Sequence, residues 1–162
     1  MTLIPQQIRK FSEAPLSTQL LLSLMGDYKR PYDKISEMVK AGTLIPLKRG
    51  LYVPGESLDM KGPHPFLVSN HLYGPSYVSL EQALAYWGLI PERTNEISAV
   101  TLKRSSVFTN ALGRFSYTQV PLPYYSFGLV RQVLSQKEVV LMASAEKALC
   151  DLVVTTSGVN LR

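Results

Sequence analysis

The stretch "LIPLKRGLYVP", residues 44–54, carries two adjacent cations and a glycine in the middle of an apolar run. Apolar β-prone residues flank Lys48-Arg49-Gly50 on both sides, which predicts a β-hairpin that turns at the glycine. Gly50 suits a tight reversal of the backbone. Asn-Gly would serve a hairpin that only closes a core. We therefore expect Lys48 and Arg49 to be held out at the tip as a contact surface.

Two helices are predicted directly before this hairpin. Residues 16–26 start at the candidate N-cap Ser17 or Thr18, and residues 31–42 start at Pro31, which suits the first helical position. In the second helix, Ile35, Met38 and Val39 form the expected buried stripe. A shorter helix is indicated around residues 5–13. Helix, turn, helix and hairpin within about fifty residues is the order of a winged helix-turn-helix.

In a winged helix-turn-helix, the N-terminal turn of the second helix enters the major groove and the hairpin lies beside the phosphate backbone. Cations gather at both of these places in the sequence, together with one tyrosine. The residues predicted to bind double-stranded DNA are Lys29, Arg30, Tyr32, Lys34, Lys48 and Arg49. Winged helices also bind proteins, and a charged turn is often only solvated. A protein-interaction module, or a general transcriptional regulator, is therefore the alternative.

The positive charge is concentrated at the N-terminal end. Residues 1–55 hold eight Lys/Arg against four Asp/Glu, a net charge of +4, whereas residues 56–162 hold nine against eight, a net of +1. A basic small domain beside a nearly neutral larger one indicates an anionic partner for the first. A generic basic surface is the other interpretation.

A change of composition marks the predicted domain boundary. Residues 55–65, "GESLDMKGPHP", are rich in Gly and Pro and lack apolar periodicity, so we expect a linker at 56–65 between domains 1–55 and 66–162. The second domain shows a helix at 79–88 with a Ser79–Gln82 capping box and a closing helix at 144–154. The residues of the closing helix that are expected to face inward are Ala145, Ala148, Leu149, Leu152 and Val153. Between these two helices lie strand-like segments at 96–104, 114–122, 124–130 and 138–143. This order predicts an α+β fold.

Composition excludes several classes of protein. The hydrophobic fraction of 46% and charged fraction of 18% favour a packed core over disorder. No apolar run approaches the ~20 residues that span a bilayer, and the N-terminus lacks a secretory signal. A single cysteine, Cys150, allows no internal disulfide. We expect a cytoplasmic protein with no membrane partner.

The sequence shows no pattern typical of a catalytic site. His64 and His71 have no Cys or acidic cluster at metal-ligand spacing, so we interpret them as surface residues. Cys150 has apolar neighbours and is expected to be a buried structural thiol. No phosphate loop or nucleophile elbow is present, and the acids are scattered. We therefore expect neither an enzyme nor a metal or cofactor.

Aromatic residues of the second domain allow another interpretation. Tyr117, Tyr124, Tyr125 and Phe127 fall in or beside predicted strands, where aromatic rings can stack on single-stranded bases. Such residues are more often part of a sheet core, and we favour that interpretation. Residues 102–106, "LKRSS", form a second basic spot that could contact DNA or protein or be solvated.

Several segments resemble one known family. "EMVKAGTLIPLKRGLYVP" (37–54) resembles the end of the winged helix in the AbiEi family of type IV antitoxins and autoregulators, whose wing strand is commonly a basic "RGLY". "YVSLEQALAYWGLIPE" (77–92) resembles the first helix of that family's antitoxin domain. "GRFSYTQVP" (113–121) and "ASAEKALCDLV" (143–153) resemble a later strand and helix. The resemblance covers most of residues 16–155, and its specificity lies in the order of the pieces.

The resemblance implies a protein with two tasks. The N-terminal domain would bind inverted repeats in its own promoter and repress its operon. The C-terminal domain would neutralise a cognate nucleotidyltransferase-like toxin. Family members usually continue further, so a short or truncated C-terminal domain is implied.

Overall fold

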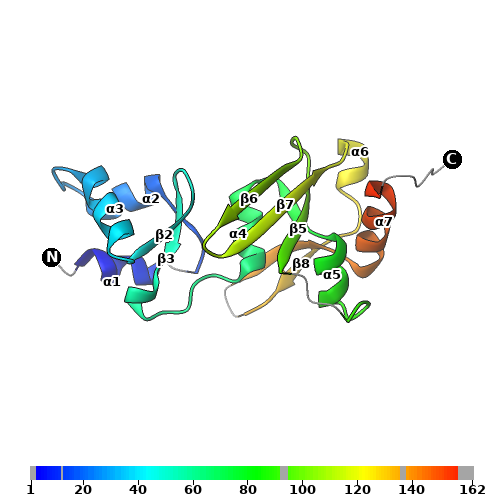
Figure 1. Cartoon of the computed structure of the whole chain (residues 1–162), viewed down its shortest axis with the longest axis horizontal. Coiled ribbons are helices and arrows are strands. Elements are labelled where there is room, and N and C mark those ends of the chain that lie inside the picture. Colours follow the sequence, from blue (N-terminus) through cyan, green and yellow to red (C-terminus); the bar gives the residue numbers. More distant parts are fainter. Residues whose placement is uncertain (1–2, 12, 92–94, 136–137, 157–162) are drawn as a thin grey trace. The chain divides into compact units, whose positions relative to one another are not determined.

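The computed structural model describes residues 3–11, 13–91, 95–135 and 138–156 of the 162-residue chain. The chain divides into two compact units, one of residues 1–64 with 110–112 and one of residues 65–109 with 113–162. Among the described residues each unit has helices and a sheet (Figure 1), which confirms the predicted α+β class. None of the helices in these ranges is long and apolar enough to cross a membrane.

The described part of the N-terminal unit contains three α-helices and a three-stranded antiparallel sheet. The two predicted helices and the predicted hairpin are all present. A short additional strand pairs with the second hairpin strand, so the strand order is β1-β3-β2. The elements are α1 (Leu3–Lys10), β1 (Leu16–Ser17), α2 (Thr18–Met25), α3 (Pro31–Lys40), β2 (Leu44–Lys48) and β3 (Leu51–Pro54).

Local sequence explains where α2 and α3 begin. The Ser17 hydroxyl accepts a hydrogen bond from the Leu20 backbone N–H at 3.1 Å, as its N-cap position predicts. Pro31 occupies the first turn of α3, where its missing N–H is no loss. Gly42, just beyond α3, has a φ of 77°, in the left-handed region that terminates helices.

Apolar side chains from the helices and the hairpin form the core of this unit. Ile8 and Leu21 are fully buried, on α1 and α2. The predicted inward stripe of α3 is confirmed at Ile35 and Met38, which are at most 5% exposed, and Val39 packs against the same cluster. Burial of these side chains against one another holds the three helices on the sheet.

A β-bulge shapes the hairpin. Pro46 pairs with Tyr52 but Lys48 pairs with Leu51, so β2 has one residue more than β3 at this point. The extra residue is Leu47, which is only 4% exposed. The strict alternation of inward and outward side chains along β2 is thereby broken, and such a bulge increases the local twist of the strand near the hairpin tip.

The predicted linker begins inside the N-terminal unit. Gly55 donates its N–H to the Thr43 carbonyl oxygen at 2.8 Å, and a Cβ on Gly55 would lie 1.8 Å from the Gly42 carbonyl oxygen. A 3-10 helix, η1 (Glu56–Leu58), follows, and Leu58 is buried in the core. Residues 55–58 are therefore packed in this unit. Gly55 is needed because two backbone segments approach closely there. From composition alone, a glycine needed for such packing cannot be told from a glycine in a flexible linker.

The C-terminal unit has a mixed six-stranded sheet with the order β6-β7-β5-β4-β9-β8. Strand β4 is antiparallel to β5 and parallel to β9, while β5 is parallel to β7. Helix α4 packs on β4 and β9, and α5 packs against α7. The elements are α4 (Pro65–Leu72), β4 (Ser76–Val78), α5 (Leu80–Tyr86), β5 (Glu96–Thr101), β6 (Ser106–Asn110), β7 (Gly113–Gln119), α6 (Leu122–Tyr125), β8 (Leu129–Val133), β9 (Val139–Ala143) and α7 (Ala145–Thr155).

Four of these elements, α4, β4, β6 and α6, have no counterpart in the sequence prediction. Helix α4 is buried on most sides, so it lacks the polar face that would give a helical period. The strand expected at 124–130 is wrong in its first half, because Tyr124 and Tyr125 end the short helix α6 and the strand starts at Leu129.

The start of α5 also differs from the predicted capping box. The Ser79 hydroxyl donates to the Asp151 carboxylate at 2.5 Å and makes no cap bond. Ser98 on β5 replaces it, since its hydroxyl accepts from the Gln82 N–H at 3.3 Å and donates to the Ser79 carbonyl oxygen at 2.7 Å. The cap therefore comes from a neighbouring strand, which no local sequence pattern indicates.

Helix α7 is turned relative to its prediction. The predicted inward residues Leu149 and Val153 are 48% and 41% exposed, and Cys150, expected to be buried, is exposed. The buried positions are Lys147 and Asp151, which were not predicted, and Ala148, which was. Apolar periodicity failed here because two oppositely charged side chains occupy the inner face.

Candidate functional site

The residues predicted to bind DNA lie at two places in the N-terminal unit. One is the loop before α3 together with the first helical turn of α3, and the other is the tip of the β2–β3 hairpin. Figure 1 shows both at the upper edge of this unit. Tyr32 is 65% exposed, and the Arg30 side chain is 83% exposed. Lys48 and Arg49 are exposed as well. These side chains can therefore reach a macromolecular partner.

The hairpin tip is fixed to the start of α2. Gly50, with a φ of 84°, accepts a hydrogen bond at its carbonyl oxygen from the Thr18 N–H at 3.0 Å. Helix α2 has eight residues, which is about 12 Å at 1.5 Å per residue. The tip and the turn before α3 therefore lie at opposite ends of a helix whose length is close to the ~12 Å width of a DNA major groove.

A hollow of about 640 Å³ lies at the α2–α3 turn. Its lining combines Tyr28 with three cations and three acids, so its formal net charge is zero. The charged lining residues are Lys29, Arg30, Lys34, Asp27, Asp33 and Glu37. The residues predicted to bind DNA include the cations of this surface and none of its acids.

Two of the acids are ion-paired with predicted DNA-binding residues. Arg30 Nη1 lies 3.8 Å from Asp33 Oδ2, and Lys34 Nζ lies 3.6 Å from Glu37 Oε2. Both carboxylates are 69% exposed. The i, i+3 spacing of each pair is the signal that could have identified them from the sequence.

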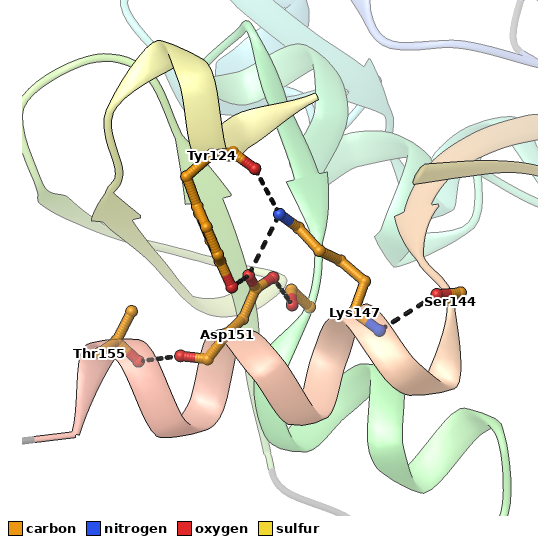
Figure 2. A network of polar contacts seen from close by, with 6 residues as sticks. Tyr124, Ser144, Lys147, Asp151 and Thr155 are labelled. Atoms are coloured by element: carbon orange, nitrogen blue, oxygen red, sulfur yellow. Dashed lines mark hydrogen bonds and ion pairs between the residues drawn. The ribbon is translucent and has the colours of Figure 1, made fainter. Parts of the chain in front are cut away.

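A second polar cluster is buried in the C-terminal unit (Figure 2). Lys147 Nζ lies 3.6 Å from Asp151 Oδ1, and both side chains are 0% exposed. Lys147 also donates to the Tyr124 carbonyl oxygen at 2.7 Å. Asp151 in turn accepts hydrogen bonds from the Tyr124 hydroxyl at 2.6 Å and from Ser79. Helix α7 is thereby joined to α6 and to the junction between β4 and α5.

Aromatic rings enclose the buried ammonium group. Lys147 Nζ lies 3.6 Å from the ring centroids of both Tyr124 and Phe127. Gly128, with a φ of 70°, leaves room for the lysine, since a Cβ there would lie 2.7 Å from Lys147 Cβ. The cation is thus held by one carboxylate, one carbonyl and two π faces.

Burial changes the proton affinities in this cluster. It lowers the pKa of Lys147, and the Asp151 carboxylate opposes that shift. Burial also raises the pKa of the Tyr124 hydroxyl, and its hydrogen bond to Asp151 adds to the effect. Every charged group of the pair is satisfied and inaccessible, so the cluster can join helices but meets no substrate in this state.

The aromatic residues considered for base stacking have different positions. Tyr117 and Tyr125 are 2% and 7% exposed and belong to the core, as we favoured. Tyr124 and Phe127 enclose Lys147. In the basic spot at 102–106, Lys103 Nζ lies 5.2 Å from the centre of the Tyr73 ring. The two buried tyrosines are therefore unavailable for base stacking, whereas Lys103 and Arg104 of the basic spot are exposed.

Among the described residues, no group of three His, Cys, Asp or Glu side chains is arranged to hold a metal ion. His71 is exposed, as predicted for a surface histidine, and His64 is half-buried.

In comparisons with known proteins, no family model matches this chain, and no curated protein matches it either.

Proposed function

We propose that the N-terminal unit is a winged helix-turn-helix that binds double-stranded DNA, and that the chain is a transcriptional autorepressor. The observation that carries the proposal is the order α1-β1-α2-α3-β2-β3 combined with the strand order β1-β3-β2. In this interpretation α3 enters the major groove and the β2–β3 hairpin is the wing.

The exposed cations agree with these assignments. Lys48 and Arg49 at the hairpin tip would contact phosphates, which position a protein on the duplex without reading its sequence. Arg30 and Tyr32, at the start of α3, would reach base edges in the groove. The proposal thus separates a positioning contact at the wing from a reading contact at the helix.

One observation favours the alternative, a winged unit that docks a protein. The hollow beside α3 has no net charge and contains the aromatic Tyr28 and exposed acids, features that suit a mixed polar protein surface. DNA remains the stronger proposal, because the adjacent cations at the tip lie on the hairpin that would serve as the wing.

The resemblance to the AbiEi family extends the proposal. Under it, the DNA would be inverted repeats in the promoter of the chain's own operon, and the C-terminal unit would neutralise a nucleotidyltransferase-like toxin. Sequence resemblance alone supports this extension.

The wing is tested by replacing Lys48 and Arg49 with Ala. Affinity for all duplexes should fall by a similar factor, and the slope of log K against log salt should decrease by about 0.9 for each lost phosphate contact. The control is Lys10→Ala with Lys40→Ala, which removes the same charge from the ends of α1 and α3. Gel-shift titrations at several salt concentrations measure both quantities. An unchanged affinity and salt slope in the wing variant would contradict the proposal.

A further inference from the structure

The acidic residues of α3 lie where a DNA-binding surface would be expected to be positive. Asp33 and Glu37 line the hollow at the α2–α3 turn, and their carboxylates are 69% exposed. Each forms an ion pair with a cation that the sequence predicts to bind DNA, Arg30 for Asp33 and Lys34 for Glu37. Over the whole lining of this hollow, which includes the turn before α3, three acids therefore balance three cations.

This balance affects random and specific DNA differently. Attraction between cations and phosphates is independent of sequence and provides essentially all non-specific affinity. A carboxylate beside the duplex repels every phosphate equally, so it reduces that affinity. A guanidinium that meets a matching base edge gains directed hydrogen bonds, and an exposed ion pair is weak enough to be exchanged for them.

We propose that Asp33 and Glu37 are specificity-determining residues. Their carboxylates neutralise Arg30 and Lys34 and so suppress binding to random DNA, until contacts with a matching base sequence take the place of the two ion pairs. This inference rests on the proposed DNA-binding function and adds to it the device that separates operator from other sequences. Specificity of this kind comes from a repulsive element as well as an attractive one.

The variants are Asp33→Asn, Glu37→Gln and the two combined, which retain shape and remove charge. Glu56→Gln is the matched control, because Glu56 is an exposed acid of the same unit outside the hollow. Two probes are used with the full chain: a random-sequence duplex, and a duplex enriched from a random library by repeated binding to the unaltered protein. Thermal melting of each variant checks that it is folded.

We expect the double variant to bind the random duplex on the order of tenfold more tightly at 0.1 M salt, with a steeper salt dependence. Affinity for the enriched duplex should rise less, so the ratio of the affinity for the enriched duplex to the affinity for the random duplex falls. The control should leave that ratio unchanged.

Two results would overturn the inference and are distinguishable. If the unaltered protein binds the enriched duplex but the folded double variant keeps the same ratio, Asp33 and Glu37 do not determine specificity and the DNA-binding function stands. If the unaltered protein enriches no duplex from the library and does not bind the random duplex at any salt concentration, the proposed function fails and the inference fails with it.

Discussion

At the scale of single residues, Gly55 shows how one position can fix a local path of the chain. Its backbone φ of −88° is ordinary, so conformational freedom does not explain the glycine. The reason is contact, since a Cβ would lie 1.8 Å from the Gly42 carbonyl oxygen. Backbone cannot move aside as a flexible side chain can.

We predict that Gly55→Ala destabilises the N-terminal unit by about 1–3 kcal/mol, the usual cost of overpacking, or more. Separation of the two segments would also weaken the Gly55–Thr43 hydrogen bond. Urea unfolding followed by amide NMR signals of this unit measures the effect. Gly62→Ala is the control, because no atom lies within 4 Å of the place that its Cβ would take. Equal stability of the two variants would contradict the predicted clash.

Tyr117 is one of several tyrosines with a raised pKa, and its titration should be visible in stability. Burial raises its pKa to about 12, against an opposing hydrogen bond from Ser69. The folded state therefore keeps the proton above pH 10, where the unfolded state releases it. The contribution to stability is complete below pH 10 and is lost as the pH rises toward 12.

We predict that the free energy of unfolding falls with pH between 10.5 and 12, and that Tyr117→Phe makes this fall less steep by about 1.4 kcal/mol per pH unit. The lowered pKa of Lys147 gives a slope of opposite sign, because the unfolded state binds its proton more tightly, but that slope ends near the ordinary value of 10.5. Denaturant titrations at several pH values measure the slope. An identical slope in the Phe variant would show that Tyr117 keeps an ordinary pKa.

At the scale of elements, α7 is held by polar contacts on its inner face. Lys147 and Asp151, one turn apart, are buried with Tyr124 and Ser79 around them, while Leu149 and Val153 are exposed. Such a pair gives little net stability relative to apolar residues, but removal of one partner leaves a buried charge uncompensated.

We predict that Asp151→Asn destabilises the C-terminal unit by about 3–5 kcal/mol, because the ammonium of Lys147 loses its carboxylate. Adding Lys147→Met to this variant should recover a large part of the loss. Urea unfolding followed by the fluorescence of Trp87, the chain's single tryptophan, measures both variants. A double variant that is less stable than Asp151→Asn would argue against charge compensation as the role of the pair.

At the scale of the whole molecule, the two units carry separate cores and separate surfaces. The core of the first unit comes from its helices, its hairpin and Leu58. The second has a six-stranded sheet with its own helices. The exposed cations proposed to bind DNA all belong to the first unit.

We predict that residues 65–162 fold alone and bind DNA poorly, since none of the proposed contact residues lies in this fragment. Trp87 fluorescence and circular dichroism test the folding, and gel shifts test the binding. If the resemblance to the antitoxin family holds, this fragment should also protect cells that express the cognate toxin. Protection by residues 1–64 alone, with none from 65–162, would reverse the assignment of tasks.

Local sequence was sufficient to predict the helix–turn–helix–hairpin order, a helix start at Ser17 or Thr18, another at Pro31, and the α+β class. These features depend on residues close together in the chain, where propensity and periodicity act. Four cations of the candidate site, Lys29, Arg30, Lys48 and Arg49, are exposed, as charged side chains in turns usually are, whereas the Lys34 side chain is only 28% exposed.

The strand orders, the packing of Gly55 on Gly42, the cap that Ser98 supplies to α5 and the inward face of α7 required the folded structure. Each of these depends on groups distant in sequence. Apolar periodicity assigned Leu149 and Val153 to the core, whereas the partners Tyr124, Phe127 and Ser79 make burial of Lys147 and Asp151 possible. A buried charge is stable only where such partners converge, and only the fold brings them together.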